Sequence, residues 1–331
     1  MNIRGSEVQD FLRCRKRWDY RWNQKLIAKK KNDKLFFGTL FHLYLETYYK
    51  CRSHELAKTL MMSEYYKGFD SLESEEDMEE KLSTIADNYY EHWNQDFSKY
   101  DVVATELQFV IPLSDGKNFT GTIDLVVRDE NNNLWFFDHK TTNMIDKYEK
   151  NAVMDRQINR YWWALNQLAI GNGYVVNEDY KNIELEKVYG FIYNIILKDF
   201  PVSPKQLKSG GLSKDKSQKT TYAKYLEEIR RLQLPIDEYE DILTHLNSQQ
   251  DRFFKRVVVQ RSDAEIEATI SEMKLVIADM FSPPIYRNIT TDCSWDCQHK
   301  DLCLAEIDGS DATWLRDELY EKGEKEDGSD D

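Results

Sequence analysis

Two aspartates and a lysine have the types and spacing that hydrolysis of a phosphodiester requires. Asp138 and Lys140 end the apolar run LWFFDHK, and residues two apart on a strand project from the same face, with His139 on the other. Asp124 lies in the preceding run, FTGTIDLVVR, and hairpin pairing can bring it beside Asp138. Carboxylates hold Mg²⁺ or Mn²⁺, which polarises a phosphoryl oxygen and activates water, while Lys140 orients that water or steadies developing charge. The alternative is a surface salt bridge, which explains most Asp-x-Lys sequences.

A helix expected at about residues 153–169 follows this run and carries Gln157 and Tyr161. The two side chains are four residues apart, so they share one helix face. We expect them to position the water, the lysine or a DNA strand. The alternative is an ordinary amphipathic helix on which both face solvent.

Three of the five cysteines are spaced Cys-x3-Cys-x5-Cys within CSWDCQHKDLC, namely Cys293, Cys297 and Cys303. This spacing suits a metal or iron–sulfur centre, because disulfides are rare in cytosolic proteins. Cys14, in the segment FLRCRKRW, is the natural fourth ligand. The alternative is zinc on the same ligands, or on a set in which His299 or Cys51 replaces Cys14. Otherwise we expect Cys51 to be a buried free thiol and the centre to be structural.

The elements that would position these residues run from helical to β-rich and back to helical. A capping box of Ser6 and Gln9 predicts the start of a helical segment that reaches Tyr48, with a turn near residues 31–33 and a second helical stretch to about Tyr100. Apolar runs separated by turn residues predict an antiparallel meander, at residues 102–113, 119–128 and 134–138. Further patterns predict a strand at 188–197, a helical region at 222–249 and a helix at 263–280.

Charge is distributed unevenly along a chain whose net charge is −14. Residues 1–34 hold eleven basic side chains against four acidic ones, interleaved with aromatic rings, and phosphate binding needs such local Lys and Arg. We expect DNA contact there, with a solvated helix face as the alternative. The residues expected to make it are Arg15, Arg17 and Arg21, joined by Arg256 from the alternating run 252–262. That run could equally be a charged edge strand.

Other charged segments are simpler to interpret. The lysines between Lys208 and Lys219 lie in a polar loop that could touch DNA, although solvated loops commonly look like this. The acidic tail at 317–331 is expected to be disordered. The chain start lacks the apolar stretch of a secretory signal, and no apolar run approaches the roughly 20 residues that span a bilayer, so a cytoplasmic protein is expected. No P-loop spacing or helicase motif occurs, so we expect no motor activity.

An ordered set of motifs resembles the PD-(D/E)XK nuclease superfamily, and within it the RecB-like and AddB-like nucleases, the CRISPR-associated single-strand exonucleases and phage relatives. The motifs are His42 in GTLFH, Asp124 in GTID, Asp138 and Lys140 in DHK, and Gln157 with Tyr161 in QINRY. The resemblance covers most of residues 6–304. It implies an α+β fold with an α/β core, namely a restriction-endonuclease-like mixed sheet flanked by helices.

The same resemblance implies roles for individual residues. The metal ligands would be His42, Asp124, Asp138 and the backbone carbonyl of His139, with Lys140 catalytic. Without the family pattern, His42 would be expected as a satisfied core histidine. Glu106 and Glu46 are weaker neighbours of the site, and either could be purely structural. Iron–sulfur members of the family take one cysteine before the nuclease core and three after it, which implies a [4Fe-4S] cluster on Cys14, Cys293, Cys297 and Cys303 that joins the two chain ends.

The sequence therefore predicts a metal-dependent DNA exonuclease that acts at single-stranded ends in recombination, repair or replication, in a bacterium or phage. Its expected partners are DNA and a helicase, recombinase or single-strand-binding protein, with no membrane. The alternatives are a DNA-binding subunit with a vestigial nuclease site and an endonuclease or CRISPR-type end-processing factor. One integrated domain is expected, with a helical region at 1–100, the nuclease core at 101–200, a helical and cysteine-bearing region at 201–316, and the tail at 317–331.

Overall fold

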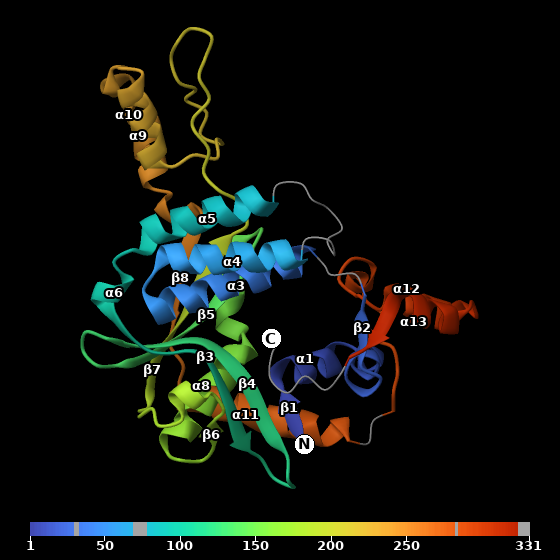
Figure 1. Ribbon diagram of the computed structural model, residues 1–331. Helices are drawn as coiled ribbons and strands as arrows, with labels where there is room; N and C mark the ends of the chain where they lie inside the picture. The colour runs from blue at the N-terminus through green and yellow to red at the C-terminus, as the bar shows by residue number, and fades with distance from the viewer. Residues whose placement is uncertain (30–32, 69–77, 282–283, 324–331) are drawn as a thin grey trace.

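A computed structural model describes residues 1–29, 33–68, 78–281 and 284–323 (Figure 1). Its helices are α1 (Gly5–Arg13), α2 (Arg15–Trp18), α3 (Asp33–Cys51), α4 (His54–Gly68), α5 (Met78–Trp93), α6 (Asp96–Lys99), α7 (Ile145–Asn151), α8 (Arg156–Ala169), α9 (Tyr222–Arg231), α10 (Glu240–Asn247), α11 (Asp263–Met280), α12 (Lys300–Asp308) and α13 (Ala312–Leu319). Its strands are β1 (Asn2–Arg4), β2 (Leu26–Ala28), β3 (Tyr100–Pro112), β4 (Asn118–Asp129), β5 (Leu134–Thr142), β6 (Tyr174–Val175), β7 (Val188–Leu197), β8 (Phe254–Val259) and β9 (Tyr320–Lys322).

A mixed seven-stranded sheet forms the centre, in the order β6-β3-β4-β5-β7-β8 with β1 beside β4. The predicted meander is antiparallel throughout, from β3 to β4 to β5. The connection through α8 then brings β7 parallel to β5, because a crossover helix returns the chain to the same end of the sheet. The prediction of a mixed central sheet flanked by helices is confirmed.

Each face of the sheet packs against its own layer of helices (Figure 1). Alternate residues along β5 and β7 enter opposite cores: Phe136 and Phe191 face α1, α8 and α11, whereas Phe137 and Ile192 face α3, α4 and α5. Strands buried on both faces are therefore almost continuously apolar, as the sequence of β7 shows. A polar side chain in this sheet is an exception that requires a reason.

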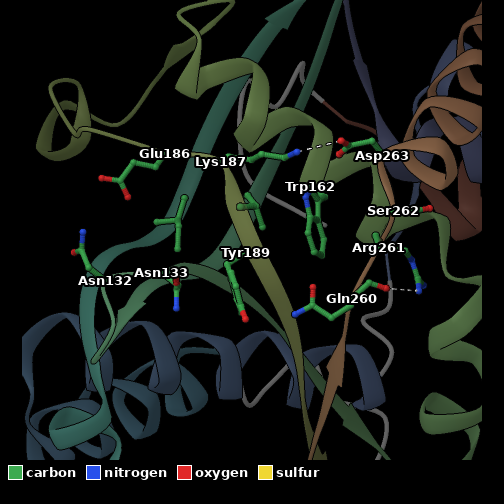
Figure 2. Close-up of a pocket in the computed structure, with 12 residues that line it drawn as sticks. Asn132, Asn133, Trp162, Glu186, Lys187, Tyr189, Gln260, Arg261, Ser262 and Asp263 are labelled. Carbon is green, nitrogen blue, oxygen red and sulfur yellow. Dashed lines mark hydrogen bonds and ion pairs between the residues drawn. The ribbon is translucent and has the colours of Figure 1, made fainter.

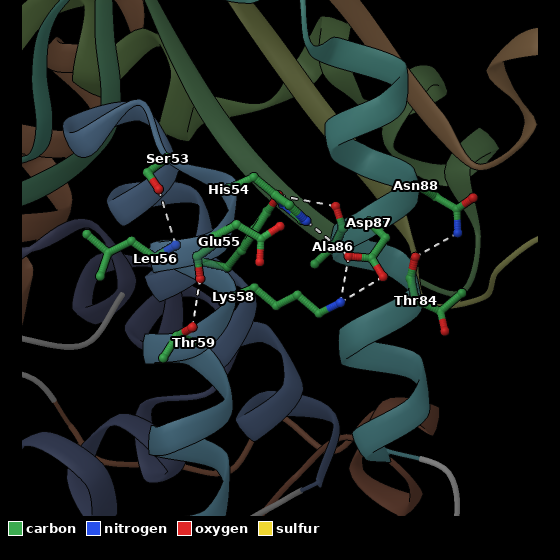
Figure 3. Close-up of polar contacts among 11 residues, drawn as sticks. Ser53, His54, Glu55, Leu56, Lys58, Thr59, Thr84, Ala86, Asp87 and Asn88 are labelled. Carbon is green, nitrogen blue, oxygen red and sulfur yellow. Dashed lines mark hydrogen bonds and ion pairs between the residues drawn. The ribbon is translucent and has the colours of Figure 1, made fainter.

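Polar contacts tie the second helical layer together (Figure 3). His54, near the start of α4, bonds to the Tyr44 hydroxyl of α3 at 2.9 Å and to the Asp87 carboxylate of α5 at 3.0 Å. Lys58 adds a second contact to Asp87 at 2.6 Å. This layer holds α3 on the sheet, and α3 carries His42.

The two ends of the chain meet beside the sheet. β2 pairs antiparallel with β9, so Leu26 lies opposite Lys322. The His299 ring lies between Tyr20 and Tyr320, with ring centroids 5.3 Å from each. The chain is thus closed by contacts between its first and last described segments.

Several sequence predictions differ from the structure. The first helical segment is broken by β2, and α1 begins at Gly5 after an extended Arg4, so Ser6 and Gln9 form no capping box. Pro235 separates α9 from α10 within the predicted helix at 222–249, because proline disrupts a helix interior. Residues 317–323, predicted to be disordered, complete α13 and form β9, whereas residues 324–331 lie outside the described residues, as does most of the turn predicted at 31–33.

No helix among the residues described here combines the length and apolar character needed to cross a bilayer.

Candidate metal and cleavage centre

β4 and β5 separate at the position of Asp124. Their backbone pairing ends at Leu125 with Phe137, and on the same edge β4 pairs with β1 only up to Thr120. Beyond the last pair the Asp124 carboxylate accepts a hydrogen bond from the His139 backbone N–H at 2.5 Å. A side chain therefore replaces the strand partner, and its second oxygen is available at the gap.

Glu106 lies opposite Asp124, because the flanking pairs are Thr105 with Leu125 and Leu107 with Ile123. Its backbone has φ of +45°, a left-handed value that is costly for a residue with a side chain. Ala104 and Leu107 are three residues apart and yet enter the same core. The inward-facing positions of β3 therefore shift by one residue here. The strained residue thus shifts the alternation of the strand.

Side chains from the connection after β6 hold this distortion in place. Asn177 donates to the Glu106 carbonyl at 3.2 Å and accepts from the Gln108 N–H at 2.7 Å. The Tyr180 hydroxyl accepts from the Thr105 N–H at 3.3 Å. These contacts take the place of ladder bonds on the outer edge of β3.

His42, Glu106 and Asp124 form the one group of three possible metal-ligating side chains found among the described residues, with ligand atoms within 4.8 Å of one another. His42 Nδ1 lies 3.8 Å from Asp124 and 3.9 Å from Glu106, while Nε2 lies 2.9 Å from the His139 carbonyl oxygen. Two carboxylates, an imidazole and a carbonyl are the oxygen-rich donors, with one nitrogen, that suit Mg²⁺ or Mn²⁺.

Electrostatics indicate that this group is built for a cation. Burial opposes a charge on His42, but Asp124 and Glu106 outweigh burial and raise the pKa of its imidazole to about 9. Burial also raises the pKa of Asp124, and Glu106 adds to that effect while His42 opposes it. A proton on His42 therefore offsets one of the two carboxylate charges, and a divalent ion could replace that proton and offset both.

The buried Asp138 forms an ion pair with the partly exposed Lys140 next to this group. Lys140 Nζ lies 2.8 Å from Asp138 Oδ2. Burial raises the pKa of Asp138 to about 7 against the attraction of Lys140. Burial would lower the pKa of Lys140, but Asp138 and Asp124 raise it above its usual value. Lys140 is therefore a cation at neutral pH, fixed by its neighbours.

The helix after β5 reaches the same ion pair. Gln157 Oε1 accepts from Lys140 Nζ at 3.3 Å, so Gln157 faces the centre and not solvent. Tyr161 is buried against Phe109, with ring centroids 5.9 Å apart, and is part of the core beneath β3. The structure therefore brings Gln157 to Lys140 and places Tyr161 one turn deeper.

Asp155 and Tyr193 also belong to the centre, and neither was identified from the sequence. Asp155 caps α8 by accepting from the Gln157 N–H at 2.7 Å, and it accepts a second bond from the Tyr193 hydroxyl. The charge of Asp155 contributes to the raised pKa values of both Asp138 and Lys140, after the larger effects already described. The available signal was the Asp-x-Gln spacing of a helix N-cap.

His139 faces the opposite side of the sheet and is locked there. Burial lowers the pKa of its imidazole well below the usual value, so the ring is neutral. Its Nδ1 lies 2.9 Å from the Asn194 amide nitrogen, and its ring stacks on Tyr49 with centroids 6.0 Å apart. The ring therefore fixes the backbone of His139, whose carbonyl contacts His42 and whose N–H contacts Asp124.

The predicted DNA contact through Arg256 is wrong. Its side chain is only 10% exposed, its guanidinium lies 3.8 Å from the Trp93 ring centroid, and it donates to the buried Asp96 carboxylate at 2.7 Å. It also donates to Asn194 at 3.4 Å. Arg256 thus completes the network behind His139 and cannot reach a phosphate.

The N-terminal arginines are also engaged. Arg17 and Arg21 both contact the buried Asp10, at 2.8 and 3.1 Å, and Arg15 pairs with Asp279. Their charge is therefore largely neutralised by neighbouring carboxylates. The predicted basic path for DNA is weaker than the sequence alone suggests.

The segments that carry the four cysteines lie together. The Cys14 sulfur accepts from the Asn288 N–H at 3.4 Å, and the Asn288 side chain donates to the Arg13 carbonyl at 2.9 Å. Burial raises the pKa of the Cys297 thiol, and the Cys293 and Cys14 thiols nearby add to it. Arg13 also bonds to Asp296 at 2.6 Å, so the first cysteine and the later loop are joined by several contacts.

The alternatives for this cysteine centre differ in their geometry. No three cysteine sulfurs in the described part of the chain lie within 4.8 Å of one another. His299 is fully buried, with no hydrogen-bond partner for Nδ1 among the described residues, and burial lowers its pKa to about 4. Cys51, expected to be buried, is exposed at the end of α3.

Glu46 lies one turn beyond His42 and is outside the three-residue group. Burial raises the pKa of its carboxyl, and Lys50 opposes that effect.

A separate open pocket of about 620 Å³ lies at the other end of β5 and β7 (Figure 2). It is lined by Leu134 and Val188, the first residues of those strands, and by Arg261, whose guanidinium donates to the Asn159 side chain at 2.8 Å. Lys187 and Asp263 pair across its edge at 3.1 Å. None of the residues of the metal group lines this pocket.

A model of the family described as the PD-(D/E)XK nuclease superfamily matches residues 5–304. A search of curated proteins finds no match.

Proposed function

This chain belongs to the PD-(D/E)XK nuclease superfamily, and we propose that it is a metal-dependent DNA exonuclease that acts at single-stranded ends in recombination, repair or replication. The observation that carries the proposal is the contact between two sets of residues. His42, Glu106 and Asp124 converge from three elements, and the ion pair of Asp138 and Lys140 lies beside them. Such an arrangement can hold a divalent cation, which promotes phosphodiester hydrolysis by polarising a phosphoryl oxygen and activating water.

In this proposal the ligands are His42, Glu106, Asp124 and Asp138, with the His139 carbonyl completing the set. A bound Mg²⁺ or Mn²⁺ would polarise the phosphoryl oxygen and lower the pKa of a water. Lys140 would stabilise the charge that develops on the phosphate, because its ammonium is fixed before the substrate arrives. Gln157 would hold Lys140, and Asp155 would hold the start of α8 that carries Gln157.

The test compares wild-type protein with Lys140→Ala and with Lys147→Ala, a control on α7. Each protein is incubated with Mg²⁺ or Mn²⁺ and with linear or circular single-stranded DNA. We expect wild type and Lys147→Ala to degrade linear DNA from its ends and to spare circles, and Lys140→Ala to lose at least about 100-fold in rate. Equal activity of Lys140→Ala would refute the catalytic assignment, and cleavage of circles would replace exonuclease by endonuclease.

A DNA-binding subunit with an inactive site is the rival function. It predicts that the wild-type protein binds DNA without cleaving it and serves a helicase or recombinase. The intact set of His42, Glu106 and Asp124 beside Lys140 opposes this rival, because a vestigial site need not keep all of these residues together.

We further propose that Cys14, Cys293, Cys297 and Cys303 bind a [4Fe-4S] cluster that joins the chain ends. The packing of the Cys14 segment on the loop that carries Cys293 and Cys297 supports one shared centre. Anaerobically purified protein should be brown and contain about four irons per chain. Zinc in stoichiometric amount in a colourless protein would support the alternative, in which His299 is the replacement ligand to test.

A further inference from the structure

Residues 201–249 form a projection, here called the arm, that extends away from the sheet (Figure 1). It contains α9, α10 and the loop before them. The arm has its own small core, separate from the two cores of the sheet and made of Leu212, Tyr225, Ile229, Tyr239, Ile242, Leu243 and Leu246. A unit that folds on its own core contributes little to the packing of the nuclease sheet, which suggests a separate role.

The arm separates its charges. Its loop, residues 201–221, carries five lysines against one aspartate, whereas residues 222–249 carry six acidic side chains against three basic ones. In a chain of net charge −14, this loop is a local positive surface. A positive surface of this kind concentrates polyanions near it.

The loop is held in a defined shape. The Ser213 N–H donates to the Lys205 carbonyl at 2.8 Å, and the Lys205 N–H donates to the Gln218 side chain at 2.9 Å. The Tyr225 hydroxyl of α9 donates to the Ser213 carbonyl at 2.9 Å. A pre-ordered loop loses less conformational entropy when it binds a ligand.

The lysines of this loop are available, unlike the N-terminal arginines. Lys205, Lys208, Lys214 and Lys216 are exposed, and none has an ion pair with a carboxylate among the residues that the structure describes. Only Lys219 is paired within the described part of the loop, with Asp199 at 2.5 Å. The loop therefore places four exposed lysines without an ion pair close together, at positions 205, 208, 214 and 216.

The arm begins at the end of the sheet that carries the cleavage centre. β7 runs parallel to β5, with Ile195 opposite Lys140, and the Lys198 N–H donates to the Thr142 carbonyl at 2.7 Å. The chain passes from this edge directly into the arm. Lys140 therefore lies near the base of the arm.

We propose that the lysine loop of the arm binds the phosphate backbone of DNA whose end is held at the cleavage centre. The ligand is a phosphodiester chain, recognised by charge and not by base sequence. The lysines that make the contact are Lys205, Lys208, Lys214 and Lys216. This inference rests on the proposed nuclease function and adds to it a second contact, outside the site of cleavage.

The test uses a triple variant, Lys208→Gln, Lys214→Gln and Lys216→Gln, and a matched control, Lys99→Gln, Lys274→Gln and Lys322→Gln. Both remove three exposed positive charges. Fluorescence anisotropy with single-stranded DNA, in EDTA and over a salt series, gives the affinity and its salt dependence. We expect the arm variant to bind long DNA about tenfold more weakly, with a salt slope reduced by about 2, and the control to match wild type. Equal losses in both variants, or none in the arm variant, would overturn the proposal.

A second measurement separates this inference from the proposed function. With Mn²⁺ present, the arm variant should show a higher KM on long DNA at unchanged kcat, and wild-type rates on an oligonucleotide too short to reach the arm. Wild-type protein that binds DNA without cutting it would end the exonuclease proposal, and the anisotropy result alone would then decide the arm. A fall in kcat on the short substrate would overturn a role confined to binding.

Discussion

Glu106 supplies the second carboxylate beside His42, and it does so from a left-handed backbone that costs about 1–3 kcal/mol. A structural role would not require that strain, whereas a metal ligand held by Asn177 would justify it. We predict that Glu106→Gln lowers Mn²⁺ affinity at least about tenfold, measured by calorimetry, because one anionic ligand is lost. Glu46→Gln, one turn from His42, is the control and should bind as wild type. Unchanged affinity in Glu106→Gln would remove Glu106 from the site.

His42 gives the centre a pH dependence whose sign is fixed by its raised pKa of about 9. Below that value the metal-free site holds a proton that an incoming ion must displace. At pH 8, where the Asp138 carboxyl with its pKa of about 7 is largely ionised, we predict release of nearly one proton per Mn²⁺ bound. Calorimetry in buffers of different ionisation enthalpy measures this number. It should approach zero well above pH 9 and be absent in His42→Gln; proton release by that variant at pH 8 would contradict the assignment.

The same proton affects stability in the absence of metal. The folded-state pKa of His42 exceeds the usual value of 6.5, so the charged form stabilises the fold fully below about pH 6.5, and that contribution is lost as pH rises through about 9. The stability difference between wild type and His42→Gln should therefore narrow across this range.

The positions of individual site residues could be predicted where side chains alternate between the two faces of a strand. Asp138, Lys140 and His139 follow this alternation, and the structure places them on the faces that the alternation predicts. Glu106 breaks it, because the phase of β3 shifts at its left-handed backbone. Counting back from the turn at Asp115 and Gly116 would still have paired Glu106 with Asp124, so a signal for it was present in the hairpin.

At the scale of elements, long apolar runs were predictable and short strands were not. β7 and α11 match their predicted bounds, and β3, β4 and β5 lie where the turn residues required. β1, β2, β6 and β9 have two or three residues each, too few to show any period. Such strands form because they pair with a strand edge that is distant in the sequence. A short window of the sequence does not contain that partner.

The sequence of β8 also did not show the role of Arg256. Alternating basic and apolar residues are expected both in a strand that binds phosphates and in one whose arginine pairs with a buried carboxylate. Arg256 from β8 and Asp96 from α6 form the buried pair. We predict that Arg256→Met destabilises the fold by about 3–5 kcal/mol, because Asp96 is left buried and unpaired. Adding Asp96→Leu should recover part of that loss. DNA affinity of the folded variant should equal wild type; a loss of affinity without a loss of stability would restore the DNA role.

In the whole molecule, the basic N-terminal segment mainly forms ion pairs with the later part of the chain, and it contributes less to an exposed positive surface. Arg13 bonds to Asp296, Arg15 to Asp279 and Lys16 to Glu306 at 3.1 Å, so its charges join distant parts of the sequence. This pairing could not be predicted from local composition, because the partners lie more than 260 residues away. Among the described residues, the arm loop instead groups four exposed lysines that have no ion pair.

Because the two ends of the chain pack together, we expect them to unfold as one cooperative unit. β2 pairs with β9, and the Cys14 segment packs on the loop that carries Cys293 and Cys297, so a cluster on these cysteines would hold residues 1–29 and 284–323 together. We predict that Cys297→Ser lowers hydrogen-exchange protection in both segments at once, while β3, β4 and β5 keep theirs, because the sheet has its own two cores. Cys51→Ser, at an exposed thiol, is the control and should leave both segments protected. Loss of protection confined to residues 293–303 would show that the cysteines stabilise only their own loop and that β2, β9 and the ion pairs suffice to close the chain.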